Sequence, residues 1–130
     1  MVVATYGRGI YRAKLLEGCY TGTTVYVNSG QTINTLKTIC SNYTINNGGN
    51  LAISSQVVFA NEASITVKSG GVLTIDGGVL INANINVESG GKLVVTNDGR
   101  IVLNSYDNLV INTGAIYEVW EGKITVRYTH

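Results

Sequence analysis

The stretch that decides the fold is ITVKSGGVLTI at residues 65–75, which returns as INVESGGKLVV at residues 85–95. In both copies apolar and polar residues alternate on either side of a Ser-Gly-Gly turn, which is typical of strands with one buried face. The phrase returns with the same polarity after 20 residues. A meander of hairpins would not repeat it in this way, so the pattern predicts stacked coils of a solenoid.

Three weaker copies of the phrase, at residues 25–33, 43–53 and 109–119, extend the repeat to five coils. Stacking would align their apolar residues in columns, in which each fully buried aliphatic side chain contributes about 1.5–3 kcal/mol. A glycine column at the turn would supply the positive φ of a tight corner. The predicted apolar columns are Val25/Tyr43/Ile65/Ile85/Leu109, Val27/Ile45/Val67/Val87/Ile111, Ile33/Leu51/Leu73/Leu93/Tyr117 and Ile53/Ile75/Val95/Val119, and the glycine column is Gly30/Gly48/Gly70/Gly90/Gly114.

A third strand follows a second turn in the last three coils, where residues 79–82, 101–104 and 124–127 are rich in Val, Ile and Leu. Three strands and three turns in about 20 residues predict a roughly triangular coil. We therefore expect an all-β chain, a single-stranded parallel β-helix or β-solenoid of about five coils. The coil length favours the right-handed form, because the strict hexapeptide repeat of the left-handed form is missing. The expected domains are an N-terminal cap or remnant of a preceding domain at 1–23 and the solenoid at 24–130.

The composition excludes several classes of function. The formal net charge is +1 and only 13% of residues are charged, whereas a nucleic-acid binder needs a basic stripe. No apolar run approaches the roughly 20 residues of a membrane span, so we expect no membrane insertion. Proline is absent, which suits strands that are paired on both edges.

Acidic residues recur at one predicted corner as Asp76, Asp98 and Glu121, in steps of 22 and 23 residues. Stacked carboxylates repel one another unless they are exposed, protonated or bridged by a cation. The favoured interpretation is ordinary Asp-Gly turn chemistry at an exposed corner. The alternatives are a site for a hard cation such as Ca²⁺ and a catalytic carboxylate pair.

Asparagines recur at another corner as Asn61, Asn82 and Asn104. Their amides are predicted to stack as a ladder, with a ligand-binding role as the alternative. Lys68 and Glu88 occupy equivalent positions of neighbouring coils, which predicts a surface ion pair that contributes little to stability.

The residues that usually carry nucleophilic or zinc chemistry are few. Cys19 and Cys40 lie about one coil apart, so a disulfide is expected if the protein is secreted, and two cysteines are too few for a zinc site. His130 is the final residue and the only histidine, which argues against a Ser-His or Cys-His pair. Tyr117 and Trp120 are interpreted as cover for the C-terminal end, with sugar stacking as the alternative. The sequence assigns no catalytic, cofactor or metal residue, and we expect no enzymatic activity and no cofactor.

Two segments resemble known protein families. Residues 4–11, ATYGRGIY, resemble the closing strand of Asp-box β-propellers of the sialidase or sortilin type, although the Asp-box itself is absent. The Ser-Gly-Gly-x-Leu phrases resemble the β-helix stretches of secreted, surface-associated bacterial multidomain proteins. The resemblances imply that a propeller precedes this segment in a longer parent chain, and that the protein is extracellular or at the cell surface. Residues 4–11 are otherwise expected to cap the first coil.

These observations favour a non-catalytic structural or spacer module whose partners are other domains of the parent chain. A carbohydrate-binding or adhesin module with a glycan as partner is the alternative. A polysaccharide lyase or hydrolase is a third hypothesis, disfavoured because the groove-forming loops of such enzymes are missing from the sequence.

Overall fold

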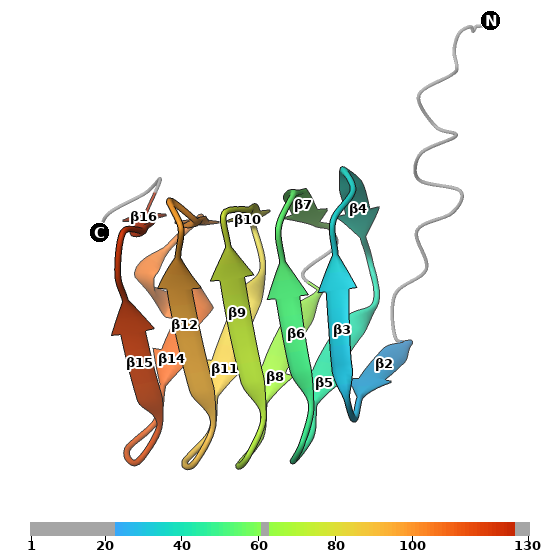
Figure 1. Cartoon of the computed structure of the whole chain (residues 1–130), viewed down its shortest axis with the longest axis vertical. Helices are drawn as coiled ribbons and strands as arrows, with labels where there is room; N and C mark the ends of the chain where they lie inside the picture. Colours follow the sequence, from blue (N-terminus) through green and yellow to red (C-terminus); the bar gives the residue numbers. More distant parts are fainter. Residues whose placement is uncertain (1–22, 61–62, 127–130) are drawn as a thin grey trace, which may run out of the picture.

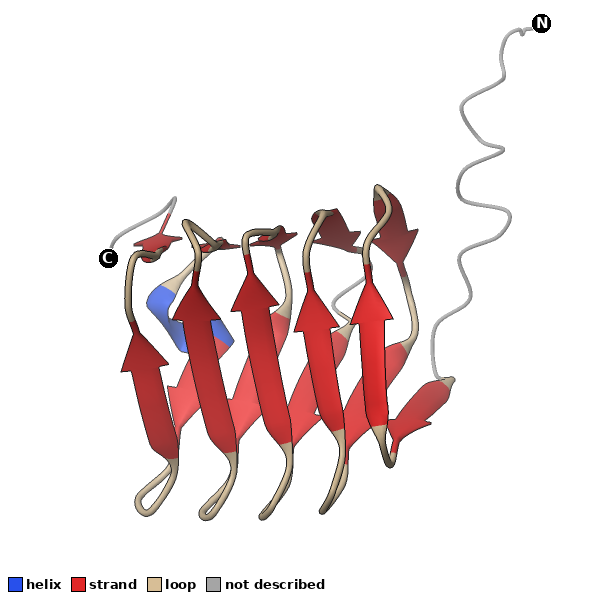
Figure 2. Ribbon diagram, in the orientation of Figure 1, coloured by secondary structure: helices blue, strands red, loops and turns tan. Residues whose placement is uncertain are grey.

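The chain forms a β-solenoid of five coils, which confirms the predicted fold class (Figure 1). The structure, a computed structural model, describes residues 23–60 and 63–126. Each coil contributes three short strands, and one 3₁₀ turn, η1 (Tyr106–Asn108), interrupts the fourth coil (Figure 2). In chain order the strands are β2 (Thr24–Val27), β3 (Gly30–Ile33), β4 (Lys37–Ile39), β5 (Asn42–Ile45), β6 (Asn50–Ile53), β7 (Gln56–Phe59), β8 (Ser64–Val67), β9 (Val72–Asp76), β10 (Val79–Ile81), β11 (Asn84–Val87), β12 (Lys92–Thr96), β13 (Arg100–Leu103), β14 (Leu109–Ile111), β15 (Ile116–Val119) and β16 (Lys123–Val126).

The strands form three parallel five-stranded sheets, one for each side of the coil. The first sheet has the order β14-β11-β8-β5-β2, the second β15-β12-β9-β6-β3, and the third β16-β13-β10-β7-β4. Figure 1 shows the second sheet in front, with its five strands side by side and pointing the same way. Sequence analysis predicted the third strand in three coils only, and the structure adds β4 and β7.

The registers of the first sheet confirm two predicted columns in full, those through Val25 and Val27. In the second sheet the position of Ile33 was predicted wrongly, because it pairs with Ile53 and not with Leu51. The residue that pairs with Leu51 is Gln31. The cause is a shorter first turn, in which two residues connect β2 to β3 whereas four connect β5 to β6.

The same shorter turn removes Gly30 from the predicted glycine column. Gly30 is the first residue of strand β3, pairs with Asn50, and is not among the glycines with positive φ. The other four glycines of the column do have positive φ, between +82° and +91°. They form a continuous chain of backbone hydrogen bonds, in which each N–H donates to the carbonyl of the glycine one coil further on: Gly48 to Gly70 (3.1 Å), Gly70 to Gly90 (3.0 Å) and Gly90 to Gly114 (3.0 Å).

The core runs along the axis of the solenoid because alternate residues of every strand point inward. In each of coils two to four, both inner positions of the strand after the Gly turn are filled by aliphatic residues without solvent exposure. The third sheet adds aliphatic residues and one aromatic residue. The buried apolar residues are Val27, Ile33, Ile39, Ile45, Leu51, Ile53, Val57, Phe59, Ala63, Ile65, Val67, Leu73, Ile75, Leu80, Ala83, Ile85, Val87, Leu93, Val95, Ile101 and Leu103.

The two ends of the described solenoid differ in chemistry. In the first coil the inner columns of Leu51 and Val57 are occupied by Gln31 and Lys37, both exposed. In the last coil the corresponding residues are apolar, and Tyr117 is 49% exposed. Within the described residues the C-terminal coil therefore carries the core pattern to its end without polar substitution.

Candidate functional site

The most distinctive concave feature lies at the corner between the third and first sheets, where the connections between strands differ in length. Two residues connect β10 to β11 in the third coil, whereas four connect β7 to β8 and five connect β13 to β14. A recess lies at this corner beside the short β10–β11 connection. We call it the corner notch; it has a volume of about 490 Å³ and is lined, among the described residues, by Val58, Phe59, Ala60, Asn82, Asn84, Asn104 and Asn108.

Asn82 at the base of the corner notch breaks two rules of the repeat. It directly follows Ile81, which pairs with Val58 and Val102. By the same register, Asn82 corresponds to Phe59 and Leu103 on the neighbouring coils. Both of these residues are apolar and buried. Its φ is +65°, a left-handed conformation that asparagine tolerates better than most residues.

The Asn82 side chain also leaves a hydrogen-bonding group unused. Its Oδ1 is closed off from solvent and accepts no hydrogen bond. An unsatisfied buried acceptor costs about 1–3 kcal/mol, so native structures rarely retain one without a reason. Among the described residues, Asn82 is the only one with such an atom.

The wall of the corner notch on the fourth coil is held by a network around η1. Ser105 is the N-cap: its Oγ accepts a hydrogen bond from the Asp107 N–H (3.2 Å), and its own N–H donates to Asn108 Oδ1 (3.0 Å). The Asn108 Nδ2 group in turn donates to Asn84 Oδ1 on β11. This capping box fixes two of the amides that line the notch.

The described residues of the corner notch form a neutral, polar lining. Four carboxamides supply both donors and acceptors, and Val58, Phe59 and Ala60 supply an apolar wall. None of the described lining residues carries a charge. The arrangement can exchange hydrogen bonds with an uncharged molecule, and it offers no group suited to nucleophilic attack or proton transfer.

The predicted asparagine ladder is not formed in the way expected. Asn82 is level with Phe59 and Leu103, so Asn104 lies one position further along its own coil. The two asparagines share the corner notch but do not stack. Asn61 lies outside the described residues. The prediction failed because similar spacing in the sequence does not place residues at the same register position when the connections between strands differ in length.

The predicted acidic column is also broken by a turn of different length. Asp76 pairs with Thr96 and not with Asp98, because the turn after β12 has one residue more than the turn after β9. The Asp76 carboxylate accepts a hydrogen bond from Asn97 Nδ2. Asp98 and Glu121 do lie on successive coils, where the Asp98 N–H donates to the Glu121 carbonyl.

Charge balance at this corner argues against the cation alternative. Asp98 and Glu121 line a shallow hollow together with Arg100 and Lys123, so two carboxylates face two cationic groups. In the described ranges, no cluster of three or more His, Cys, Asp or Glu side chains is placed to hold a metal ion. The corner therefore agrees with the interpretation of Asp-Gly as turn chemistry.

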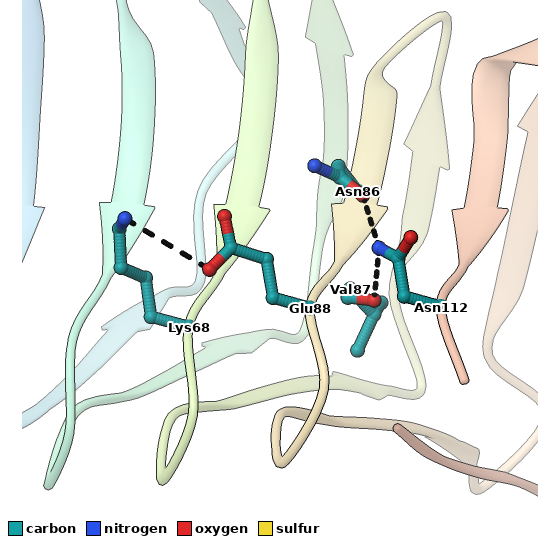
Figure 3. A network of polar contacts seen from close by, with 5 residues as sticks. All are labelled: Lys68, Asn86, Val87, Glu88 and Asn112. Atoms are coloured by element: carbon teal, nitrogen blue, oxygen red, sulfur yellow. Dashed lines mark hydrogen bonds and ion pairs between the residues drawn. The ribbon is translucent and has the colours of Figure 1, made fainter. Parts of the chain in front are cut away.

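The outer surface of the first sheet carries polar contacts between coils (Figure 3). The predicted ion pair is present, with Lys68 Nζ 3.9 Å from Glu88 Oε1 and both side chains well exposed. One coil further, Asn112 Nδ2 donates to Asn86 Oδ1 (2.7 Å) and to the Val87 carbonyl (2.8 Å). Asparagine contacts between coils thus occur at this surface as well as at the corner, where Asn108 donates to Asn84.

The remaining residues of interest are only partly described. Cys40 is disulfide-bonded, and Cys19 lies outside the described residues, as does His130. Tyr117 and Trp120 are both exposed on the last coil, Trp120 by 59%. Tyr117 pairs with the buried Leu93 of the preceding coil, and the interpretation of the two residues as cover for the C-terminal end stays a prediction.

Two residues of the corner notch, Asn84 and Asn108, were not predicted from sequence. The usable signal was local: asparagine occurs on both sides of Ala83 and on both sides of the Ser-Tyr-Asp segment at 105–107. Both clusters fall between the third strand of one coil and the first strand of the next. Only the structure shows that these clusters, one coil apart, face the same recess.

Comparison of the chain with known protein families, with curated proteins and with solved structures found no match. Within the described ranges, no helix has the length and apolar character needed to cross a bilayer.

Proposed function

We propose that this chain is a structural module, a rigid β-solenoid spacer that serves other domains of a longer parent protein. The observation that carries the proposal is the unbroken register of three parallel sheets through all five coils. Each coil is bonded to the next on three sides, and its core is continuous with that of its neighbours. Such a stack resists bending, and its length increases by about 4.8 Å for each coil.

An extracellular or surface location is part of the proposal. The disulfide at Cys40 supports it, because disulfides persist in oxidising compartments and are rare in reducing ones. The resemblance of the Ser-Gly-Gly-x-Leu phrases to β-helix stretches of secreted proteins points the same way. Protease accessibility and antibody labelling of intact cells that carry the native gene test it, and a protein protected inside the cell would overturn it.

The modular architecture is tested by deleting residues 65–84, which span one complete coil from Ile65 to the residue before Ile85. Because Ile85 then takes the place of Ile65 above Tyr43, the remaining four coils should fold. Small-angle scattering should show a particle shorter by about 5 Å. Collapse to an unfolded chain would contradict the repeat architecture as the basis of the function.

The spacer role is tested in the native gene by replacing residues 24–126 with an unrelated, inert solenoid of equal length. A spacer acts through length and stiffness, so surface display and the activity of neighbouring domains should be retained. Loss of function despite normal expression would show that specific side chains matter. A globular domain of similar mass serves as the matched control and should not substitute.

A further inference from the structure

The corner notch has features that the repeat does not explain. We propose that it binds a small, neutral, polyhydroxylated ligand, such as a single sugar unit, through the carboxamides of Asn82 and Asn104. The proposal goes beyond the spacer role and does not depend on it, because the coils would remain stacked whether or not the notch is occupied. The observations behind it are the cost of Asn82 to stability, the chemistry of the lining, and the freedom of the Asn82 amide to move.

Asparagine at position 82 lowers the stability of the folded protein relative to glycine. The corner requires a positive φ, +65° at this residue, and glycine adopts such a conformation at no steric cost. Gly77 fills a positive-φ position at another corner of the same coil. Glycine at position 82 would leave no buried acceptor, whereas Asn82 leaves Oδ1 without a partner. The amide is therefore retained at a cost to stability, as is typical of functional sites.

The lining of the corner notch matches the chemistry of a sugar. A carboxamide offers one acceptor and two donors, and a sugar hydroxyl is both donor and acceptor. The apolar wall of Val58, Phe59 and Ala60 suits the C–H face of a sugar ring. The volume of about 490 Å³ lies within the range of small-molecule sites. The described lining residues carry no charge, so they favour a neutral ligand over an acid or a phosphate.

A ligand can reach Asn82 only if its side chain moves. Its Oδ1 is closed off from solvent, so a ligand hydroxyl reaches it only after the amide rotates toward the notch. The rotation breaks no hydrogen bond of Oδ1, because it makes none. Asn104 is exposed on the fourth coil and lines the same notch, so it can contact the same ligand from the next coil. Asn84 and Asn108 keep their mutual hydrogen bond and form the rigid part of the wall.

The test is a titration of the full chain, followed by NMR of the side-chain amide signals. The probes are glucose, galactose, mannose and N-acetylglucosamine, with glucuronate as the charged comparison. We expect at least one neutral sugar to shift the Asn82 and Asn104 amide signals in a saturable manner, with a dissociation constant on the order of millimolar. Glucuronate should bind no more tightly than its neutral counterpart.

The variants are chosen to keep the fold. Asn82→Gly preserves the positive φ and removes the amide, and it should weaken binding about tenfold. Asn97→Gly is the matched control: it also removes a positive-φ asparagine, with φ of +55°, but at a different corner. It should bind as the unmodified chain does. Asn104→Ala provides a second, exposed variant, which should also weaken binding.

Three results would overturn the proposal. One is the lack of a saturable shift with any neutral sugar up to its solubility limit. Another is binding that persists unchanged in Asn82→Gly, which would place it elsewhere. The third is a sugar-soaked crystal with only an ordered water on Asn82 Oδ1, which would explain the amide without a ligand. A folded Asn82→Gly protein with unchanged stacking would at the same time leave the spacer proposal intact.

Discussion

The backbone N–H of Gly70 donates a hydrogen bond to the carbonyl oxygen of Gly90, 3.0 Å away on the next coil. Both residues have positive φ, +82° and +86°, so the same left-handed corner is stacked on itself. The bond continues the ladder of the sheets around a turn, where backbone groups are often left to solvent. The glycine corner is therefore a structural column and not a flexible hinge.

A valine at Gly90 should destabilise the protein strongly. A β-branched residue is strained at φ of +86°, and its Cβ would overlap the Ser69 hydroxyl on the preceding coil. We expect a loss of about 2 kcal/mol or more in the free energy of unfolding, measured by urea titration. Gly30→Val is the control, because a Cβ there has nothing within 4 Å and the residue begins a strand. Equal losses at the two positions would contradict the account of this corner.

Truncation of a side chain in the inner column of Leu51, Leu73, Leu93 and Tyr117 should destabilise the protein less at the C-terminal end than in the middle. Leu93 and Tyr117 pair in register, but Leu93 is fully buried whereas Tyr117 is 49% exposed. Leu93→Ala should lower the free energy of unfolding by about 2–5 kcal/mol. Tyr117→Ala should lower it by less than about 1 kcal/mol. A large loss at Tyr117 would mean that something covers the C-terminal coil in solution.

The stability of the protein should fall at alkaline pH through Tyr43. Burial raises the pKa of the Tyr43 phenol above its usual value of 10.0, and the ring packs edge-on against Phe59, with centroids 6.1 Å apart. The folded state thus holds the phenolic proton more tightly than the unfolded chain does. The contribution is complete below the unfolded pKa and is lost as the pH rises through the higher folded pKa.

The measurement compares the unmodified protein with Tyr43→Phe in urea titrations between about pH 9 and pH 12. Lysine deprotonation affects both proteins alike, so their difference isolates Tyr43. The unmodified protein should lose stability relative to the variant as the pH rises. A difference that does not change with pH would show that Tyr43 is not desolvated by folding.

The Lys68–Glu88 ion pair should contribute little. The groups are 3.9 Å apart and their side chains are 50% and 40% exposed, so solvent and salt screen the attraction. A double-mutant cycle with Lys68→Ala and Glu88→Ala should give a coupling energy below about 0.5 kcal/mol. A larger value that survives 1 M salt would show that the pair is more rigid than its exposure indicates.

Sequence reasoning succeeded where the repeat is regular. The phrases at 65–75 and 85–95 have turns of equal length, and their pairing was predicted residue by residue. It failed for Ile33, Gly30 and Asp98, each of which follows or lies in a turn that is shorter or longer than that of a neighbouring coil. When a turn gains or loses one or two residues, the pairing of the residues next to it with the neighbouring coil changes. Sequence spacing alone does not show which residues are then paired.

The amino-acid sequence by itself determined the architecture of this protein, because period-two alternation and a recurring glycine turn can be satisfied together only by stacked strands. The tertiary structure alone decided which residues of neighbouring coils are paired, since pairing depends on backbone hydrogen bonds between strands about 20 residues apart in the sequence. It therefore decided that Asn82 stands in an inner position between Phe59 and Leu103. It also showed a notch, with uncharged described lining residues, at the corner where sequence spacing had predicted a ladder.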